Sequence, residues 1–108
     1  MSAPTIGLAL DVTVHLLPTD AGGRTQSIVS GYRPLCFIET PNGTERVFGL
    51  CWLDLDAPIA PGDSGDGRLS FDIAVSNDVR ALLHVGSKFG LAEGAKRVGS
   101  AEVRRIDP

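Results

Sequence analysis

Long hydrophobic runs are absent from this 108-residue sequence, and no apolar stretch approaches the roughly 18 residues that a membrane span needs. No phosphate-binding loop ends in Gly-Lys-Ser or Gly-Lys-Thr, so nothing indicates nucleotide binding. Cysteine is scarce: Cys36 and Cys51 lie in apolar runs, away from any paired short-spacing motif. Because no signal peptide precedes them, we expect both to be reduced, buried thiols of a cytosolic protein. The sequence therefore predicts no cofactor, no metal and no membrane contact.

Charge is also limited and unevenly distributed. Charged residues make up 21% of the chain and the net charge is −3, a profile typical of a single soluble domain. Residues 39–78 contain eight acids and two bases, whereas residues 79–108 contain six bases and three acids. The acidic centre argues against general phosphate binding, which needs Lys and Arg to neutralise a nucleic-acid backbone. A basic patch near the C-terminus and a scattered, solvated charge distribution both remain open.

Alternation of apolar and polar residues is abundant, and it predicts strands. Every second residue of 8–16 is apolar, as in a long strand with one buried face, whereas residues 47–55 are apolar on both faces. A change of apolar phase after Val98 predicts a bulge near Gly99. The expected strands are residues 8–16, 47–55, 68–75, 79–85, 88–92 and 97–106. Since no stretch carries a helical stripe, we expect an all-β fold, either a small closed antiparallel barrel or a sandwich.

One string resembles a catalytic motif. Gly62-Asp63-Ser64-Gly65 matches the sequence around the nucleophile of chymotrypsin-type proteases, and His15 lies upstream in the matching order. Those enzymes assemble their triad between two barrels, and this chain is long enough for one. We therefore interpret residues 63–67 as turn sequence. His15 and His84 are expected to be solvated or satisfied histidines, since neither has a Cys or Asp partner at readable spacing.

No other motif in the sequence indicates a metal site or a catalytic site. The spacing of four aspartates does not match a calcium loop, which needs ligands at alternate positions and a terminal Glu. These aspartates are at positions 54, 56, 63 and 66. We therefore expect no metal site and no enzymatic activity.

Five separated motifs, each containing glycine, mark the chain from residue 22 to residue 99. They are Gly22-Gly23-Arg24, Gly31-Tyr32-Arg33-Pro34, Pro61-Gly62-Asp63, Phe89-Gly90-Leu91-Ala92-Glu93-Gly94 and Val98-Gly99. In this order and at near-matching spacing, they resemble the third, C-terminal domain of bacterial elongation factor Tu. The resemblance covers about residues 10–106 and implies a small closed six-stranded antiparallel Greek-key β-barrel.

The first two motifs have a structural interpretation. Gly22, Gly23 and Gly31 permit backbone angles closed to other residues, and Pro34 leads into the next strand without needing a ladder donor. Arg33, set between Tyr32 and Pro34, is expected to fold over the barrel and bond loop carbonyls as a latch.

The resemblance also implies contacts with RNA and protein. In the family, this domain touches the T-stem backbone of aminoacyl-tRNA, packs against the GTPase domain and meets the exchange factor Ts. Candidate RNA contacts are Arg24, Arg33, Thr44, Glu93 and Gly94. Thr25, Leu35 and Ala92 replace a histidine, a glutamine and an arginine of the family pattern, and a basic residue near Asn77-Asp78 is missing. Four other cations are candidates to compensate for these losses: Lys96, Arg97, Arg104 and Arg105.

These observations favour a non-enzymatic, stand-alone interaction module. It is expected to bind a protein partner, or itself, through the surface that packs on other domains in the family. Candidate contacts are Leu35, Phe48, Leu50 and Trp52, although Trp52 is equally a core candidate. Two alternatives stay open: a module that binds tRNA or structured RNA, and a defence or immunity protein that mimics the elongation-factor surface.

Overall fold

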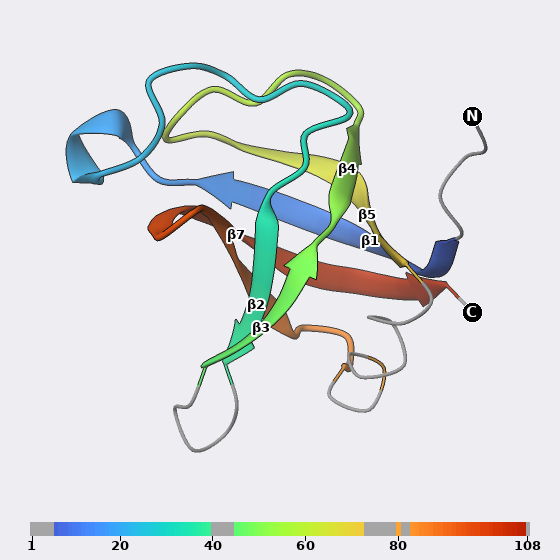
Figure 1. Ribbon diagram of the computed structural model, residues 1–108. Coiled ribbons are helices and arrows are strands. Elements are labelled where there is room, and N and C mark those ends of the chain that lie inside the picture. The colour runs from blue at the N-terminus through green and yellow to red at the C-terminus, as the bar shows by residue number, and fades with distance from the viewer. Residues whose placement is uncertain (1–5, 40–44, 73–79, 81–82, 108) are drawn as a thin grey trace, which may run out of the picture.

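The computed structural model describes residues 6–39, 45–72, 80 and 83–107. One antiparallel sheet contains seven described strands in the order β3-β2-β6-β7-β1-β5-β4. The strands are β1 (Ile6–Leu16), β2 (Leu35–Glu39), β3 (Glu45–Leu50), β4 (Trp52–Leu55), β5 (Ser64–Asp72), β6 (Lys88–Glu93) and β7 (Lys96–Asp107). A short 3-10 helix, η1 (Thr19–Ala21), follows β1. The sheet curls, so that β2 and β3 cross in front of β1 and β7 in Figure 1.

Strand β1 is central because it pairs with β5 on one side and with β7 on the other. Its alternate apolar residues, from Leu8 to Leu16, are buried, while the intervening residues are partly or fully exposed. The predicted half-buried strand over residues 8–16 is therefore confirmed. Across the core, Phe71 of β5 and Phe89 of β6 bring their ring centroids to 5.7 Å. Within the described ranges, no helix combines the length and the apolar character that crossing a bilayer requires.

The prediction of a closed six-stranded barrel is wrong: the sheet is a curled half-barrel of seven strands. The run 47–55, expected to be one strand, is divided into β3, which pairs with β2, and β4, which pairs with β5. Gly49 has a φ of 102°, and Cys51 belongs to neither strand. The chain bends at this point because its two halves pair with different neighbours. Strands β3 and β4 consequently lie at opposite edges of the sheet.

The segment that leads into β2 lies along β4. Isolated bridges join Ile28 to Ile59 and Tyr32 to Leu53. The N–H of Gly31 donates to the Leu53 carbonyl at 2.7 Å, and the N–H of Leu53 donates to the Tyr32 carbonyl at 2.9 Å. These bonds protect the β4 edge and fix the position of Tyr32.

The C-terminal strands agree with the sequence pattern. Strands were expected over residues 88–92 and 97–106, and the structure has β6 and β7 there, each extended by one or two residues. The two strands form a hairpin around Gly94 and Ala95. The bulge near Gly99 is confirmed, because Leu91 pairs with Gly99 whereas Ala92 pairs with Arg97, leaving Val98 as the extra residue.

Other boundaries differ from the prediction. Residues 63–67 were expected to be a turn, yet β5 begins at Ser64, because this stretch pairs with the far end of the long strand β1. Within the predicted strand 68–75, residues 73–75 lie outside the described residues. The same holds for residues 79, 81 and 82 of the predicted strand 79–85, and its described residues 83–85 form no strand.

The expectation of reduced thiols is also wrong in this structure. Cys36 and Cys51 form a disulfide, with their Cα atoms 6.3 Å apart, and both are fully buried. The cysteines are 15 residues apart, so no short motif announces them. They meet because Leu35 pairs with Leu50 in the antiparallel β2–β3 ladder, which places Cys36 and Cys51 diagonally across that pair.

Candidate functional site

The loop after η1 presents Arg24 in a fixed position. Gly22 ends η1 with a φ of 91°, and the N–H of Gly23 donates to the Pro18 carbonyl at 3.0 Å. A Cβ on Gly23 would overlap the Leu17 carbonyl and would lie 2.8 Å from the Pro18 carbonyl oxygen, so only glycine fits there. The Thr19 hydroxyl donates to the Arg24 carbonyl at 2.6 Å and closes the loop. The Arg24 side chain, 21% exposed, leaves this loop toward the β6–β7 turn.

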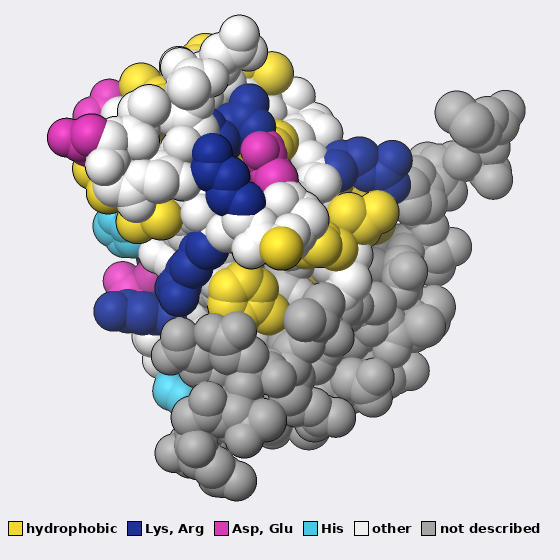
Figure 2. Space-filling model, turned by 60° about the vertical axis from the view of Figure 1, so that its left-hand side comes forward, with side chains coloured by type: hydrophobic (Ala, Val, Ile, Leu, Met, Phe, Trp, Pro, Cys, Tyr) yellow, Lys and Arg dark blue, Asp and Glu magenta, His cyan; other side chains and the backbone are white. Residues whose placement is uncertain are grey.

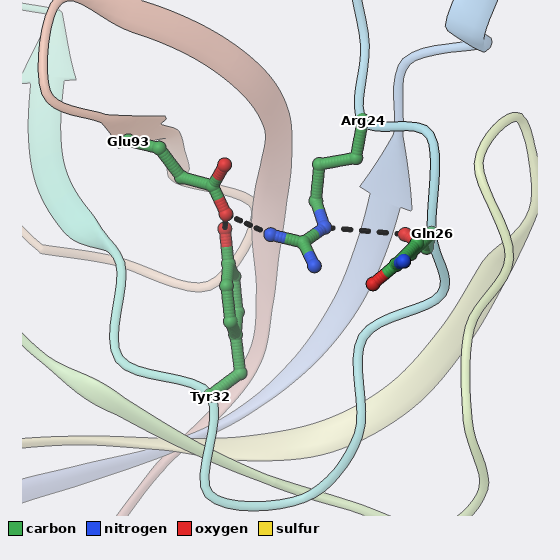
Figure 3. Close-up of polar contacts among 4 residues, drawn as sticks. All are labelled: Arg24, Gln26, Tyr32 and Glu93. Carbon is green, nitrogen blue, oxygen red and sulfur yellow. Dashed lines mark hydrogen bonds and ion pairs between the residues drawn. The ribbon is translucent and has the colours of Figure 1, made fainter.

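Arg24, Tyr32 and Glu93 form a polar cluster, shown in Figure 3. The Arg24 guanidinium forms an ion pair with Glu93 through Nη1 and Oε2, and the Tyr32 hydroxyl donates to the same oxygen at 2.6 Å. The guanidinium carbon lies 5.1 Å from the Tyr32 ring centroid, and Nε donates to the Gln26 carbonyl at 3.2 Å. Three segments distant in sequence therefore meet at one carboxylate oxygen.

Arg24 makes the latch that was expected of Arg33. The Arg33 side chain is exposed, and it has no hydrogen bond or ion pair within the described part of the chain. The reason is that the Tyr32–Leu53 bridge places Tyr32, rather than Arg33, toward the hairpin end that carries Glu93.

The cluster shifts the ionisation of both acids. Burial raises the pKa of Tyr32 well above its usual range, and the Glu93 carboxylate that accepts the hydrogen bond from its hydroxyl adds to this effect. The hydrogen bond from Tyr32 lowers the pKa of Glu93, with further lowering by the positive charges of Arg24 and Lys96. At neutral pH, Glu93 is thus a carboxylate and Tyr32 a neutral donor.

Additional cations surround the cluster. Lys96 pairs with Glu93 across the β6–β7 turn, and the guanidinium of the adjacent Arg97 lies 5.5 Å from the Phe37 ring centroid. Figure 2 shows dark blue Lys and Arg side chains gathered on one face around a magenta acidic side chain. We name Arg24, Lys96 and Arg97 the cation cluster.

Arg104 and Arg105 have acidic partners instead. Arg104 forms an ion pair with Asp66 at 3.8 Å, and Arg105 with Asp11 at 3.9 Å. Of the other two cations, Lys96 is opposite Glu93 in the β6–β7 ladder and Arg97 is opposite the neighbouring Ala92.

An apolar strip lies on the outer face of β2, β3 and β4. Leu35 and Leu50 are opposite each other in the β2–β3 ladder, and Leu50 is 55% exposed. Trp52 is half-buried and lies outside the core, since the fully buried residues on either side of it are Cys51 and Leu53. The side chain of Phe48 lies outside the described part of the structure. We name Leu35, Leu50 and Trp52 the outer strip.

His15 and Ser64, the two residues that resemble part of a protease motif in the sequence, do meet in the structure. Ser64 Oγ and His15 Nδ1 form a 2.6 Å hydrogen bond across the exposed face of β1 and β5. Among the described residues, no carboxylate bonds the other ring nitrogen of His15. His84 similarly contacts Ser87 Oγ at 3.1 Å within its own turn.

A polar hollow of about 330 Å³ lies between β1, β4, β5 and β7. Its Asp11 and Arg68 side chains pair with each other at 3.2 Å. In the described ranges, no three His, Cys, Asp or Glu side chains gather as a metal site.

No protein-family model matches the chain. Elongation factor Tu 2 of Streptomyces avermitilis is similar to it. The identity is 32% over 94 residues, which cover 87% of this chain and 22% of that protein. The chain thus spans about a fifth of the length of this relative. The similarity supports a translation-factor-like domain.

The structure brings together only some of the residues that the resemblance to elongation factor Tu singles out. Arg24, Glu93 and Gly94 lie at the β6–β7 turn, whereas Arg33 stands apart from the cluster. Thr44 and the pair Asn77-Asp78 lie outside the described residues. Sequence reasoning treated Tyr32 as a structural residue and missed its hydroxyl as a partner of Glu93; no local signal marks that contact.

Proposed function

We propose that this protein is a non-enzymatic interaction module, similar to a domain of elongation factor Tu, that binds a protein partner or a second copy of itself through the outer strip. The observation that carries the proposal is Leu50, a large apolar side chain left 55% exposed on the outer face of a regular hairpin. Leu35 lies directly opposite it, and Trp52, two residues further along the chain, is half-buried. Large apolar and aromatic side chains of this kind form the centre of protein interfaces.

The cation cluster supplies the electrostatic part of the proposed interface. Leu35 pairs with Ala92 across β2 and β6, and Ala92 pairs with Arg97 across β6 and β7, so the outer strip leads toward these cations. A partner with an apolar centre and an acidic rim would be complementary to this surface.

Substitution of Leu50 tests the proposal. Leu50→Asp should abolish self-association in size-exclusion chromatography with light scattering, or remove a partner retained from an RNase-treated lysate of the source organism. Val85→Asp is the matched control, because Val85 is 63% exposed and precedes the opposite end of β6. A strictly monomeric protein that retains no partner would contradict the proposal, as would equal loss of binding in both variants.

Binding of structured RNA is the second candidate, and the cation cluster is the observation that favours it. Arg24 and Lys96 both act on the Glu93 carboxylate, and Arg97 belongs to the next residue pair of the β6–β7 ladder. Lys96→Gln should weaken tRNA binding and reduce its salt dependence by about one unit, because one phosphate contact is lost. Lys88→Gln, at the opposite end of the hairpin, should change neither. Failure of tRNA to bind at low salt would end this candidate.

Residence in the cytoplasm is part of the proposal, because translation takes place there. The Cys36–Cys51 disulfide is unusual for that compartment, where thiols are kept reduced. Acid-quenched extraction followed by thiol alkylation measures the native state directly. A fully oxidised pair in growing cells would argue against cytoplasmic residence.

A further inference from the structure

The Cys36–Cys51 disulfide lies directly beside the outer strip. Leu35 immediately precedes Cys36 in the sequence. On the other side of the cross-link, Leu50 and Trp52 flank Cys51. Both cysteines are fully buried, whereas Leu50, at the end of β3, is 55% exposed. The cross-link therefore anchors the two sides of the outer strip to the core through the residues next to them.

The end of β3 has few other attachments that fix its position. In the described part of the chain, β3 is an edge strand and pairs with β2 alone (Figure 1). A bulge interrupts its ladder directly after Cys36. Gly49 has a φ of 102°, and Cys51 belongs to no strand. Edge segments of this kind open locally at a lower cost than the core of a sheet, so the position of Leu50 depends on the cross-link.

The fold can also hold the two cysteines in the reduced form. Cys51 Sγ lies 3.7 Å from the Pro34 carbonyl oxygen, which also accepts the backbone N–H of Cys51 at 3.2 Å. A disulfide sulfur has no proton to donate, whereas a thiol does. Reduction therefore gives the buried Cys51 sulfur a donor whose acceptor is already in place, and buried thiols otherwise behave as small apolar groups. Both redox states are compatible with a folded sheet.

We propose that the Cys36–Cys51 disulfide is a redox switch for the outer strip: the oxidised form fixes Leu50 for binding, and reduction by a dithiol releases it. The inference rests on the proposed function, because the switch regulates the surface that is assigned there. Disulfides of cytosolic proteins are typically transient and redox-sensing. After reduction, a partner has to order the end of β3 as it binds, and this ordering lowers the affinity.

The switch operates by thiol–disulfide exchange with a dithiol. One thiolate of the dithiol attacks a sulfur of the Cys36–Cys51 bond, which breaks, and the other cysteine leaves as a thiolate. The second thiolate of the dithiol then attacks the mixed disulfide and releases the remaining cysteine. The dithiol is oxidised to a disulfide, two electrons pass to the protein, and two protons end on Cys36 and Cys51. Because both sulfurs are fully buried, the exchange follows local opening of the β3 edge, and oxidation is the same reaction in reverse.

Nuclear magnetic resonance tests whether the disulfide fixes the strip. Backbone ¹⁵N order parameters are compared in the oxidised protein, in the protein reduced with dithiothreitol, and in a double variant that combines Cys36→Ala with Cys51→Ser. The double variant forms no disulfide, and its hydroxyl keeps a hydrogen-bond donor at position 51. Reduction should lower the order parameter of Leu50 from about 0.85 to below about 0.6, and reoxidation should restore it. Val12 and Val103, paired in the β1–β7 ladder, are the internal control and should stay at about 0.85.

Analytical ultracentrifugation measures whether the switch acts on binding. The association measured is self-association of the chain or, if the chain is monomeric, binding of the partner that Leu50→Asp fails to retain. Reduction should weaken this association about tenfold, as expected when two side chains have to be ordered on binding. The double variant should match the reduced protein whether or not dithiothreitol is present. An order parameter of Leu50 that is unchanged by reduction, or equal affinities of the three forms, would overturn the inference.

The two measurements separate failure of the switch from failure of the proposed function. If no form of the protein associates with anything, the proposed function fails, and the order parameter of Leu50 alone decides whether the disulfide fixes the strip. If the oxidised and reduced forms associate equally, the proposed function stands and the switch fails. Circular dichroism establishes whether the reduced form is folded. Loss of the folded state on reduction would identify the disulfide as purely structural and would also overturn the inference.

Discussion

Replacing Gly90 with alanine is expected to destabilise the protein by about 2 kcal/mol. Gly90 of β6 is paired with Phe37 of β2, and a Cβ at position 90 would overlap three atoms of the Phe37 ring. The ring cannot simply lift away, because Phe37 is only 8% exposed and the Arg97 guanidinium lies 5.5 Å from its centroid. Overpacking of this kind costs about 1–3 kcal/mol if the ring stays in place. If the ring instead moves into solvent, the lost burial costs about 2 kcal/mol. The expected loss of stability is therefore similar whether the ring stays or moves.

Urea unfolding followed by far-ultraviolet circular dichroism measures the effect. The transition midpoint should fall with little change in slope, and the melting temperature should drop by about 10 °C for a domain of this size. The same change in a Phe37→Ala background should be neutral or slightly stabilising, because alanine restricts the unfolded chain more than glycine does. A cost below about 0.5 kcal/mol in the unmodified protein, or an equal cost in both backgrounds, would refute the packing of Phe37 over Gly90.

Three further predictions concern the polar cluster, the disulfide and one turn. Tyr32→Phe should lower the free energy of unfolding at pH 7 by about 1 kcal/mol. Because the folded pKa of Glu93 is lowered, its contribution is present above the unfolded value of about 4.5 and is lost as pH falls through the folded value. Urea unfolding at pH 3 and pH 7 should therefore show a smaller pH effect in Tyr32→Phe, and an unchanged effect would contradict the cluster. Reduction of Cys36–Cys51 should cost about 3 kcal/mol, as expected for a cross-link over 15 residues, unless thiol titration of the native protein finds two free thiols. Gly31→Ala should cost about 1 kcal/mol by the same assay, since φ is 92° and no atom lies within 4 Å of the added methyl; a neutral result would mean that this backbone angle is not maintained.

Much of the sheet was readable from the sequence, because the period of a strand is local. The alternation in residues 8–16 specifies which side of β1 is buried, whatever its neighbours are. The phase change after Val98 likewise marks a bulge within one strand. The same local reasoning fails at Ser64, where polar and glycine residues have the composition of a turn but pair with the C-terminal end of β1.

For the candidate site, the sequence predicted individual residues but not the contacts between them. The resemblance to elongation factor Tu singled out Arg24 and Glu93 individually, yet their pairing spans 69 residues and depends on how the loop after η1 meets the β6–β7 turn. It also attached the latch to Arg33, whereas the bridge between Tyr32 and Leu53 excludes Arg33 from the cluster. Side chains that meet across such distances leave no periodic signal along the chain.

The sequence by itself determined that the protein is all-β and where most of its strands lie, since hydrophobic alternation is a property of each strand alone. Tertiary structure decided how the run 47–55 is used. With apolar residues on both faces, that run has no phase to show which side is buried or where the strand breaks. Only the pairing of β3 with β2 and of β4 with β5 places the bend at Cys51, joins Cys51 to Cys36, and leaves Leu50 facing outward.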